Sequence, residues 1–453
     1  MCTPACCLLP HTECALCAEN TETVERKVSS ESLVKLLLGV GLDIQPALVA
    51  SLFSKIPLYF DGDDDNGKLA DSIPRLVLSQ FKWLEMLTPD SKVVAQLLDL
   101  VDVAPLHIKL DAIAIIPEVA QDEDHAEVVD RLRAQIDADP RCTNAILDAF
   151  SNLTLDSLLL VEVADKVMDL LRSAEPNDLP IVVRYLVQSC SGSQELAKKT
   201  VEALRDNLSF FSITSPLVSD EDPKASDEGQ HLTLEALRSG LRFRKVLVAC
   251  LLEEICTVEN ADDHKPFDIW ALVMLREIGE PKRQQQVDKI FKKKVTDGLF
   301  KQGFIRDSIS KHGQALKPYF RQFCAVADSL MKTHDDGLAA FGTEVYQVLF
   351  QVFGHVENRQ EVLSNLVTHT GGGDGATVDA ALDVLVHLAR EHSSTLRPFA
   401  IFIKGTLDYL DNLKPHHIRK LFNVLSMISI SGHAGRRELD DDVTIYIRKH
   451  LFS

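Results

Sequence analysis

Two segments near the start of the chain, SESLVKLLLG (residues 30–39) and QPALVASLFSK (residues 45–55), decide the fold. The first is typical of a helix that begins at a capping serine and ends at a glycine. The second is a similar apolar-rich segment that stops before Pro57, a residue type that interrupts helices. Two such helices with a short break between them indicate a helical hairpin, and the rest of the chain repeats this pattern.

Apolar-periodic segments separated by short breaks continue along the chain. Before a polar stretch near residue 214 they cover about 73–84, 90–102, 106–119, 124–137, 143–152, 155–173, 178–190 and 193–209. After it they cover about 232–254, 264–279, 282–298, 315–332, 337–354, 358–369, 377–391 and 396–410, and a further helix is opened by Pro415. Strand-like alternation is scarce. The sequence therefore predicts an all-α protein, an α-solenoid of stacked, irregular helical hairpins of the armadillo or HEAT type.

Composition divides the chain into four parts. Residues 1–29 form a Cys-rich tail that we expect to be disordered, and residues 30–213 form a first helical solenoid. Residues 214–231 begin with TSPLVSDEDPKASDEGQ, an acidic stretch rich in Pro and Ser that is typical of a loop or linker. Residues 232–453 form a second solenoid segment.

Charge and hydropathy restrict the classes of partner. The formal net charge is −19, which opposes generic binding to nucleic acid, because phosphate affinity comes from Lys and Arg. Any contact with DNA would need a local basic patch. No apolar run reaches the roughly 18 residues that span a bilayer, and no signal segment opens the chain. We therefore expect a soluble intracellular protein without a membrane partner.

No motif predicts a cofactor or a catalytic centre. The pair Cys14 and Cys17 has metal-knuckle spacing, but a second clean pair is missing. The segment TGGGDGA (370–376) lacks the lysine and the preceding strand of a phosphate loop. His416 and His417 are adjacent and are expected to point to different sides of a helix. We predict no metal, no cofactor and no enzymatic activity.

The densest basic cluster lies in PKRQQQVDKIFKKKVTDGLFKQGFIR (residues 281–306) and includes Lys292, Lys293 and Lys294. One interpretation is a weak, sequence-independent contact with the phosphates of DNA. The other is a solvated helix face with local salt bridges. The sequence leaves both open.

The last segment, DDDVTIYIRKHLFS (440–453), predicts a short helix that is apolar on two faces. Three aspartates suit its start, where their side chains can cap free N–H groups. One apolar stripe consists of Val443, Ile447 and Leu451. Lys449 lies opposite that stripe, with Ile445 and Phe452 on its own side. The lysine is therefore ringed by apolar residues on a face that the preceding helix does not need.

Four segments resemble the Fanconi anaemia group D2 family: YLDNLKPHHIRKLFNVLS (409–426), DDDVTIYIRKHLF (440–452), SLVKLLLGVGLDIQPALVASLF (32–53) and IPRLVLSQFKWL (73–84). The resemblance implies that Lys449 is the acceptor of a single ubiquitin, with Ile445, Arg448 and Phe452 forming the interface around it. Ser79, in a Ser-Gln dipeptide, matches a family position that resembles a site of the DNA-damage checkpoint kinases.

The resemblance also implies a function. Members of the family are non-enzymatic scaffolds for the repair of DNA interstrand crosslinks, found in the nucleus and on chromatin after damage. They form a heterodimer with the Fanconi anaemia group I protein on double-stranded or branched DNA, and the Fanconi core-complex ligase with its conjugating enzyme attaches ubiquitin through an isopeptide bond. The family continues well beyond the position of Lys449, so we expect a fragment or a shortened product.

A different class of function is a solenoid adaptor that binds peptides, as importin-like and adaptin-like arrays do, without a role on DNA. That interpretation predicts a groove lined by repeated Asn or Trp. The chain has only two tryptophans, at positions 83 and 270.

Overall fold

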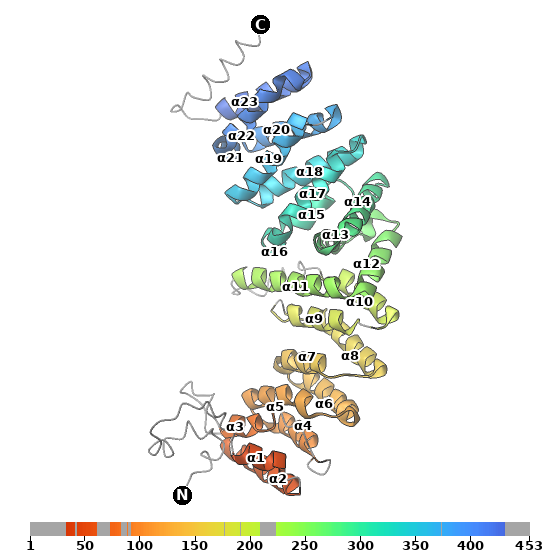
Figure 1. Ribbon diagram of the computed structural model, residues 1–453, viewed down its shortest axis with the longest axis vertical. Coiled ribbons are helices and arrows are strands. Elements are labelled where there is room, and N and C mark those ends of the chain that lie inside the picture. Colours follow the sequence, from red (N-terminus) through yellow and green to blue (C-terminus); the bar gives the residue numbers. More distant parts are fainter. Residues whose placement is uncertain are drawn as a thin grey trace, which may run out of the picture. The chain divides into compact units, whose positions relative to one another are not determined.

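The computed structural model describes residues 33–40, 43–60, 73–82, 88, 92–175, 177–190, 192–208, 223–372 and 374–430. Within these ranges the chain consists of α-helices and short 3₁₀ helices, and no strand occurs among them. Helices within each compact unit pack against one another, and Figure 1 labels them in chain order. The predicted all-α solenoid is confirmed. Contacts divide the chain into two compact units, residues 1–173 and residues 174–453.

The described part of the first unit contains eight α-helices and three short 3₁₀ helices. The α-helices are α1 (Leu33–Val40), α2 (Gln45–Lys55), α3 (Ile73–Ser79), α4 (Val93–Val103), α5 (Leu106–Val119), α6 (His125–Ala138), α7 (Thr143–Asn152) and α8 (Ser157–Leu170). The 3₁₀ helices are η3 (Ile56–Tyr59), η6 (Asp122–Asp124) and η7 (Pro140–Cys142).

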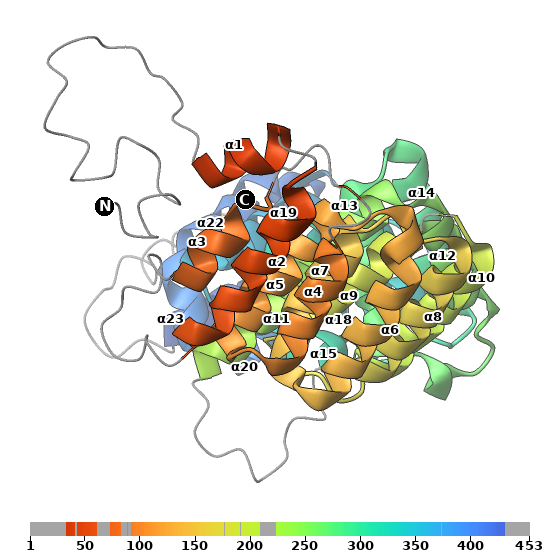
Figure 2. The same cartoon turned by 90° about the horizontal axis from the view of Figure 1, so that it is seen from below.

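Alternate helices of the first unit form two layers. Helix α5 packs between α3 and α7 in one layer, and α6 packs between α4 and α8 in the other. Consecutive helices α4 and α5 lie side by side and join the layers, which can be followed in Figure 2. The facing sides bury apolar residues such as Leu97, Ile113 and Leu132, each fully inaccessible to solvent. This is the arrangement that repeated amphipathic hairpins produce when each buries its apolar face against the next.

The described part of the second unit contains fifteen α-helices. They are α9 (Leu179–Ser189), α10 (Gln194–Asn207), α11 (Pro223–Phe243), α12 (Lys245–Thr257), α13 (Pro266–Ile278), α14 (Pro281–Thr296), α15 (Phe304–Ser310), α16 (Gly313–Leu316), α17 (Phe320–Met331), α18 (Asp336–Val352), α19 (Val356–Gly372), α20 (Gly375–Glu391), α21 (Ser393–Leu396), α22 (Ala400–Lys404) and α23 (Pro415–Ile430). The 3₁₀ helices are η8 (Ala261–Asp263), η9 (Lys317–Tyr319), η10 (Arg397–Phe399) and η11 (Gly405–Asn412).

The predicted loop over residues 214–231 extends too far toward the C-terminus. Helix α11 already begins at Pro223, a residue type that suits the first helical position, while residues 209–222 lie outside the described residues. Helix α11 packs along α9 on the other side of that segment. The contact boundary therefore falls between Ser173 and Ala174 and not in the acidic stretch.

Three other segments differ from their predicted extent. The run predicted over 232–254 is interrupted at Arg244, where α11 ends and α12 begins. The run predicted over 396–410 is a series of short helices, with a proline inside η10. Helix α15 was missed because its seven residues are too few to show a period. The predicted tail, residues 1–29, lies outside the described residues.

None of the helices in the described ranges is long and apolar enough to cross a membrane.

Candidate functional site on the second unit

The predicted ubiquitin acceptor Lys449 lies outside the described residues, as do Ile445, Arg448 and Phe452. Their roles therefore stay predictions. The last described helix before them is α23, which packs against α20. Its buried residues include Leu421 and Leu425, whereas Phe422 is half-buried.

Asp379 is the centre of a polar cluster where α23 meets α20. The ammonium of Lys420 donates to its Oδ1 at 3.1 Å, and the Nε2 atoms of His416 and His417 each lie 3.3 Å from its Oδ2. Burial alone would raise the pKa of Asp379. Hydrogen bonds from Lys420, His417 and His416 outweigh that effect and lower the pKa to about 2. The carboxylate is therefore ionised at neutral pH and ties the two helices together.

The two histidines do not point to different sides, so that prediction was wrong. Their ring centroids are 4.0 Å apart at the first turn of α23. With Asp379 they are the one group in the described ranges whose His and Asp ligand atoms could hold a metal ion.

The surroundings of His417 oppose metal binding. Its Nδ1 faces the backbone N–H of Lys414 at 3.3 Å and accepts from it, as a side chain at the third helical position does in a capping box. An accepting Nδ1 places the proton of the neutral ring on Nε2. A metal at Nε2 would need the opposite tautomer. We therefore assign the cluster to the packing of α23 on α20.

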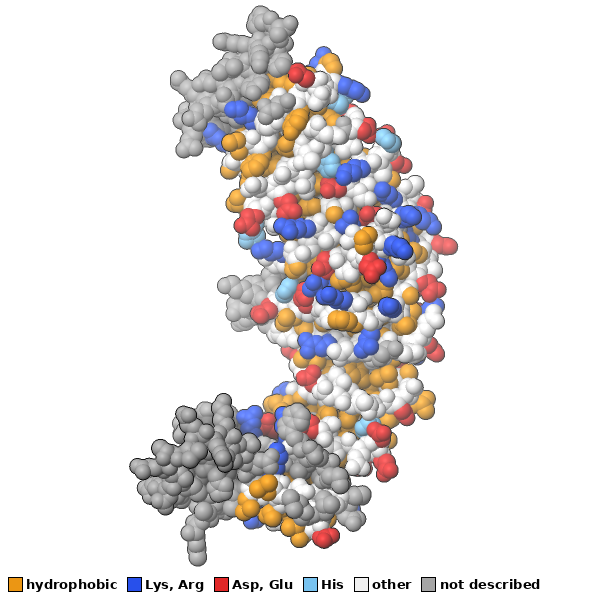
Figure 3. Space-filling model, viewed as in Figure 1, with side chains coloured by type: hydrophobic (Ala, Val, Ile, Leu, Met, Phe, Trp, Pro, Cys, Tyr) orange, Lys and Arg blue, Asp and Glu red, His pale blue; other side chains and the backbone are white. Residues whose placement is uncertain are grey.

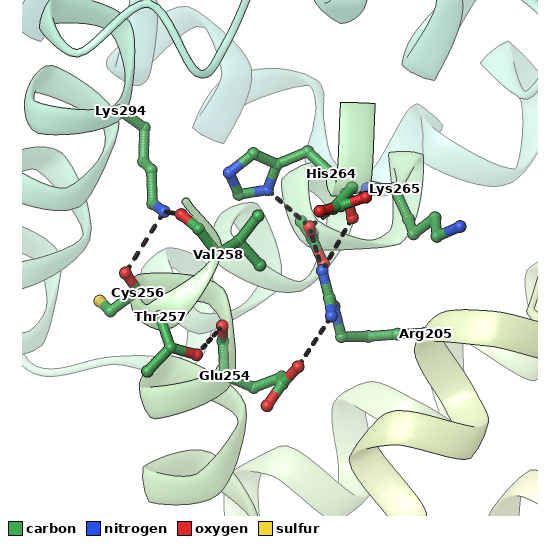
Figure 4. A network of polar contacts seen from close by, with 10 residues as sticks. Arg205, Glu254, Cys256, Thr257, Val258, His264, Lys265 and Lys294 are labelled. Atoms are coloured by element: carbon green, nitrogen blue, oxygen red, sulfur yellow. Dashed lines mark hydrogen bonds and ion pairs between the residues drawn. The ribbon is translucent and has the colours of Figure 1, made fainter. Parts of the chain in front are cut away.

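Lys294 does not belong to the predicted DNA-contacting group. Its side chain is 3% exposed, and its ammonium donates to the carbonyls of Val258 at 2.6 Å and Cys256 at 3.4 Å (Figure 4). It thus satisfies carbonyls at the end of α12, where a cation also complements the helix dipole. Burial lowers its pKa. Because this ammonium is buried and donates to two backbone carbonyls, it cannot reach a phosphate.

Lys292 and Lys293 remain candidates for DNA contact. Lys292 is half-buried and Lys293 exposed on α14, and neither forms an ion pair with a described residue. The acidic residue of the same helix, Asp288, forms an ion pair with Arg276 at 2.9 Å. Figure 3 shows Lys and Arg side chains interspersed with Asp and Glu side chains over the face that it draws. The choice between phosphate contact and a solvated face stays open.

Arg205 and Asp268 form a buried ion pair that the sequence did not reveal. The guanidinium of Arg205 donates to both carboxylate oxygens, at 2.8 and 3.0 Å, and also to Glu254 at 2.9 Å (Figure 4). His264 Nδ1 lies 2.8 Å from Asp268, and the N–H of Lys265 donates to it as well. An aspartate inside the apolar segment PFDIWALVML (266–275) was a signal of a buried partner. Its partner lies 63 positions away, so no local pattern could identify it.

Ser79 is exposed at the end of α3. Its hydroxyl donates to the carbonyl of Leu76 at 2.7 Å. The neighbouring Gln80 is 6% exposed and donates to the same carbonyl at 2.9 Å. A kinase that reads the Ser-Gln dipeptide would have to displace this buried glutamine. Phosphorylation of Ser79 stays a prediction.

The sequence matches the family described as "Fanconi anaemia protein FancD2 nuclease" over residues 4–453. The chain belongs to the Fanconi anaemia group D2 family. A "Fanconi anemia group D2 protein homolog" from Rattus norvegicus is 31% identical over 97% of this chain, and the one from Mus musculus has the same identity and coverage. The "Fanconi anemia group D2 protein" of Gallus gallus is 30% identical over 99% of this chain.

The match to the group D2 family covers nearly all of this chain, but this chain covers only 31–32% of these relatives. It therefore spans about a third of their length. Among solved structures, an engineered protein overlaps 88% of the chain at 17% identity with a TM-score of 0.30, which is too low to bear on fold or function.

Proposed function

We propose that this chain is a DNA-repair scaffold of the Fanconi anaemia interstrand-crosslink pathway, to which one ubiquitin is attached at Lys449. The observation that carries the proposal is the family match, which runs to residue 453 and so includes the sequence around Lys449. Family membership supports a DNA-repair role. Four more specific points are proposed from the resemblance alone. They are the attached ubiquitin, the group I partner, the contact with DNA, and a location in the nucleus and on chromatin.

The chemistry at Lys449 follows from the residues around it. In the helix that the sequence predicts over residues 440–453, Ile445 and Phe452 share the face of Lys449, and apolar surroundings disfavour a charged ammonium. Loss of its proton leaves a neutral amine, which attacks the carbonyl carbon of a ubiquitin thioester. The C–N isopeptide bond forms, the C–S bond breaks, and the thiolate stays on the conjugating enzyme. The catalytic groups therefore belong to that enzyme, and this chain supplies the nucleophile.

We propose a scaffold and not a nuclease for this chain, although the family description contains that word. Metal-dependent nucleases bind their ions between carboxylates that are free to coordinate. The one metal-capable group in the described ranges has its carboxylate engaged by Lys420 and one of its histidines by the start of α23. Incubation of the chain with labelled branched DNA and Mn²⁺ or Mg²⁺ tests this point; cleavage lost in Asp379→Asn would contradict it.

A reconstituted ubiquitination reaction tests the acceptor. It contains the Fanconi conjugating enzyme, its ligase, and this chain with the group I protein, and mass spectrometry maps the product. We expect one ubiquitin on the parent chain and none on Lys449→Arg. The matched control is Lys414→Arg, which changes an exposed lysine at the start of α23 and should be modified like the parent. Ubiquitin on Lys449→Arg at the parental level would refute the acceptor.

Titration with a short duplex at several salt concentrations tests the DNA contact. We expect the double variant Lys292→Gln/Lys293→Gln to bind more weakly. The slope of log K against log salt should fall by about 2, since each phosphate contact contributes roughly 0.9. Lys301→Gln is the control, because that lysine already pairs with Asp262 at 2.7 Å. An unchanged slope in the double variant would exclude phosphate contact by these two lysines and favour the solvated-face interpretation.

A further inference from the structure

A pocket of about 470 Å³ opens where two helical connections of the second unit meet. One wall is the junction of α11 with α12, and the other is the junction of α13 with α14. Its apolar floor includes Leu241, Val248 and Leu275, all buried. The pocket is therefore held by the solenoid core and does not depend on a loop.

Four cationic side chains surround this pocket, two from each wall. Arg242 and Lys245 come from the junction of α11 and α12, and Lys282 and Arg283 come from the start of α14. The acidic residue in the lining is Glu280. None of the four cations forms an ion pair with a described residue. Like charges facing one another across a cavity repel, and an anion between them removes that cost.

The backbone adds further donors at the same place. The residues preceding α12 and α14, Arg244 and Glu280, make no side-chain hydrogen bond to the helix that each precedes. The first turn of α12 therefore lacks a side-chain cap. At α14 only the N–H of Lys282 is offered in the first turn, because Pro281 has no N–H and the N–H of Arg283 donates to the carbonyl of Glu280 at 2.8 Å. Helix starts favour negative charge. Gly279 leaves room for the stem of one cation, because a Cβ there would lie only 2.5 Å from Cγ of Arg283. The arginine thus packs directly over the glycine backbone.

We propose that this pocket binds a compact, polyphosphorylated small molecule of the inositol polyphosphate type. Several phosphates on a small ring can contact cations on both walls at once, which a single phosphate cannot do. The concave shape also distinguishes the pocket from a duplex-binding face. Lys293 lies about 16 Å farther along α14 than Lys282, at 1.5 Å per residue, and is exposed outside the lining. The inference is independent of the proposed repair function.

Isothermal titration calorimetry with inositol hexakisphosphate tests the pocket on the full chain at physiological salt. We expect saturable binding at one site. The variant Lys245→Gln/Lys282→Gln removes one cation from each wall, and both residues are exposed, so the fold should be retained; circular dichroism checks this. Loss of two charge-assisted contacts should weaken binding at least about tenfold.

The matched control is Lys292→Gln/Lys293→Gln, which removes the same charge from the same region outside the pocket. It should change inositol hexakisphosphate affinity by less than about twofold. Inorganic phosphate and a short duplex are titrated in parallel, and neither should lose affinity in the pocket variant as strongly as inositol hexakisphosphate. The absence of saturable binding, or equal weakening by the pocket and control variants, would overturn the proposal. A larger effect of the pocket variant on the duplex would assign these cations to DNA instead.

Discussion

Asp268 shows how a completely buried carboxylate can remain ionised. Its side chain is 0% exposed, and burial alone would raise its pKa. Hydrogen bonds from His264, Arg205 and the N–H of Lys265 outweigh this effect and lower the pKa. The cost of removing one partner is large, because the other charge is then left buried without compensation.

We expect Asp268→Asn to lower the free energy of unfolding at pH 7 by roughly 3–5 kcal/mol, measured by urea denaturation. Because the folded pKa lies below the unfolded value of about 3.9, the stabilisation is present above that pH. It is lost as the pH falls through the folded pKa. The difference between variant and parent should therefore shrink below about pH 4.

A surface ion pair with a similar donor–acceptor distance provides the control for Asp268→Asn. Asp262 accepts from Lys301 at 2.7 Å with both side chains mostly exposed. We expect Asp262→Asn to cost less than about 1 kcal/mol. Equal losses in the two variants would show that burial does not set the strength of the Arg205 pair.

Helix α11 depends on one glycine for its contact with α9. A Cβ at Gly240 would lie 1.6 Å from Cγ1 of Val187, well inside any allowed contact. The absence of a side chain lets the two helices approach closely along a stripe that buries Leu237 and Leu241. This contact joins segments on either side of residues 209–222, so it decides which helices form one unit.

We expect Gly240→Ala to destabilise the second unit by about 1–3 kcal/mol, as overpacking does in other cores, despite the better helix propensity of alanine. Thermal unfolding followed by circular dichroism measures the effect. Gly372→Ala is the control, because nothing lies within 4 Å of a Cβ at the end of α19. A melting temperature of Gly240→Ala at or above the parental value would contradict the close packing.

The division of the whole molecule into two units has a direct test. Residues 174–453 keep the α9–α11 contact, whereas a fragment that begins at residue 232, as composition alone suggests, loses α9, α10 and the start of α11. We expect the longer fragment to remain helical and to unfold cooperatively. The shorter one should unfold at a lower temperature, because its remaining part of α11 exposes an apolar face. Equal melting temperatures of the two fragments would contradict the boundary at residue 173 and favour one in the acidic stretch.

Helical class, solenoid architecture and most helix limits follow from local patterns, because an amphipathic period, a capping serine or a proline acts within a few residues. Family membership likewise follows from the segments around Lys449 and residues 32–53. The tertiary structure alone decided features that join distant positions. It buried Lys294 against the end of α12, paired Arg205 with Asp268, and brought His416 and His417 to Asp379. It also moved the unit boundary to residue 173. These outcomes depend on which helix packs against which, and that choice is made by side-chain fit across the stack rather than by the period of any single helix.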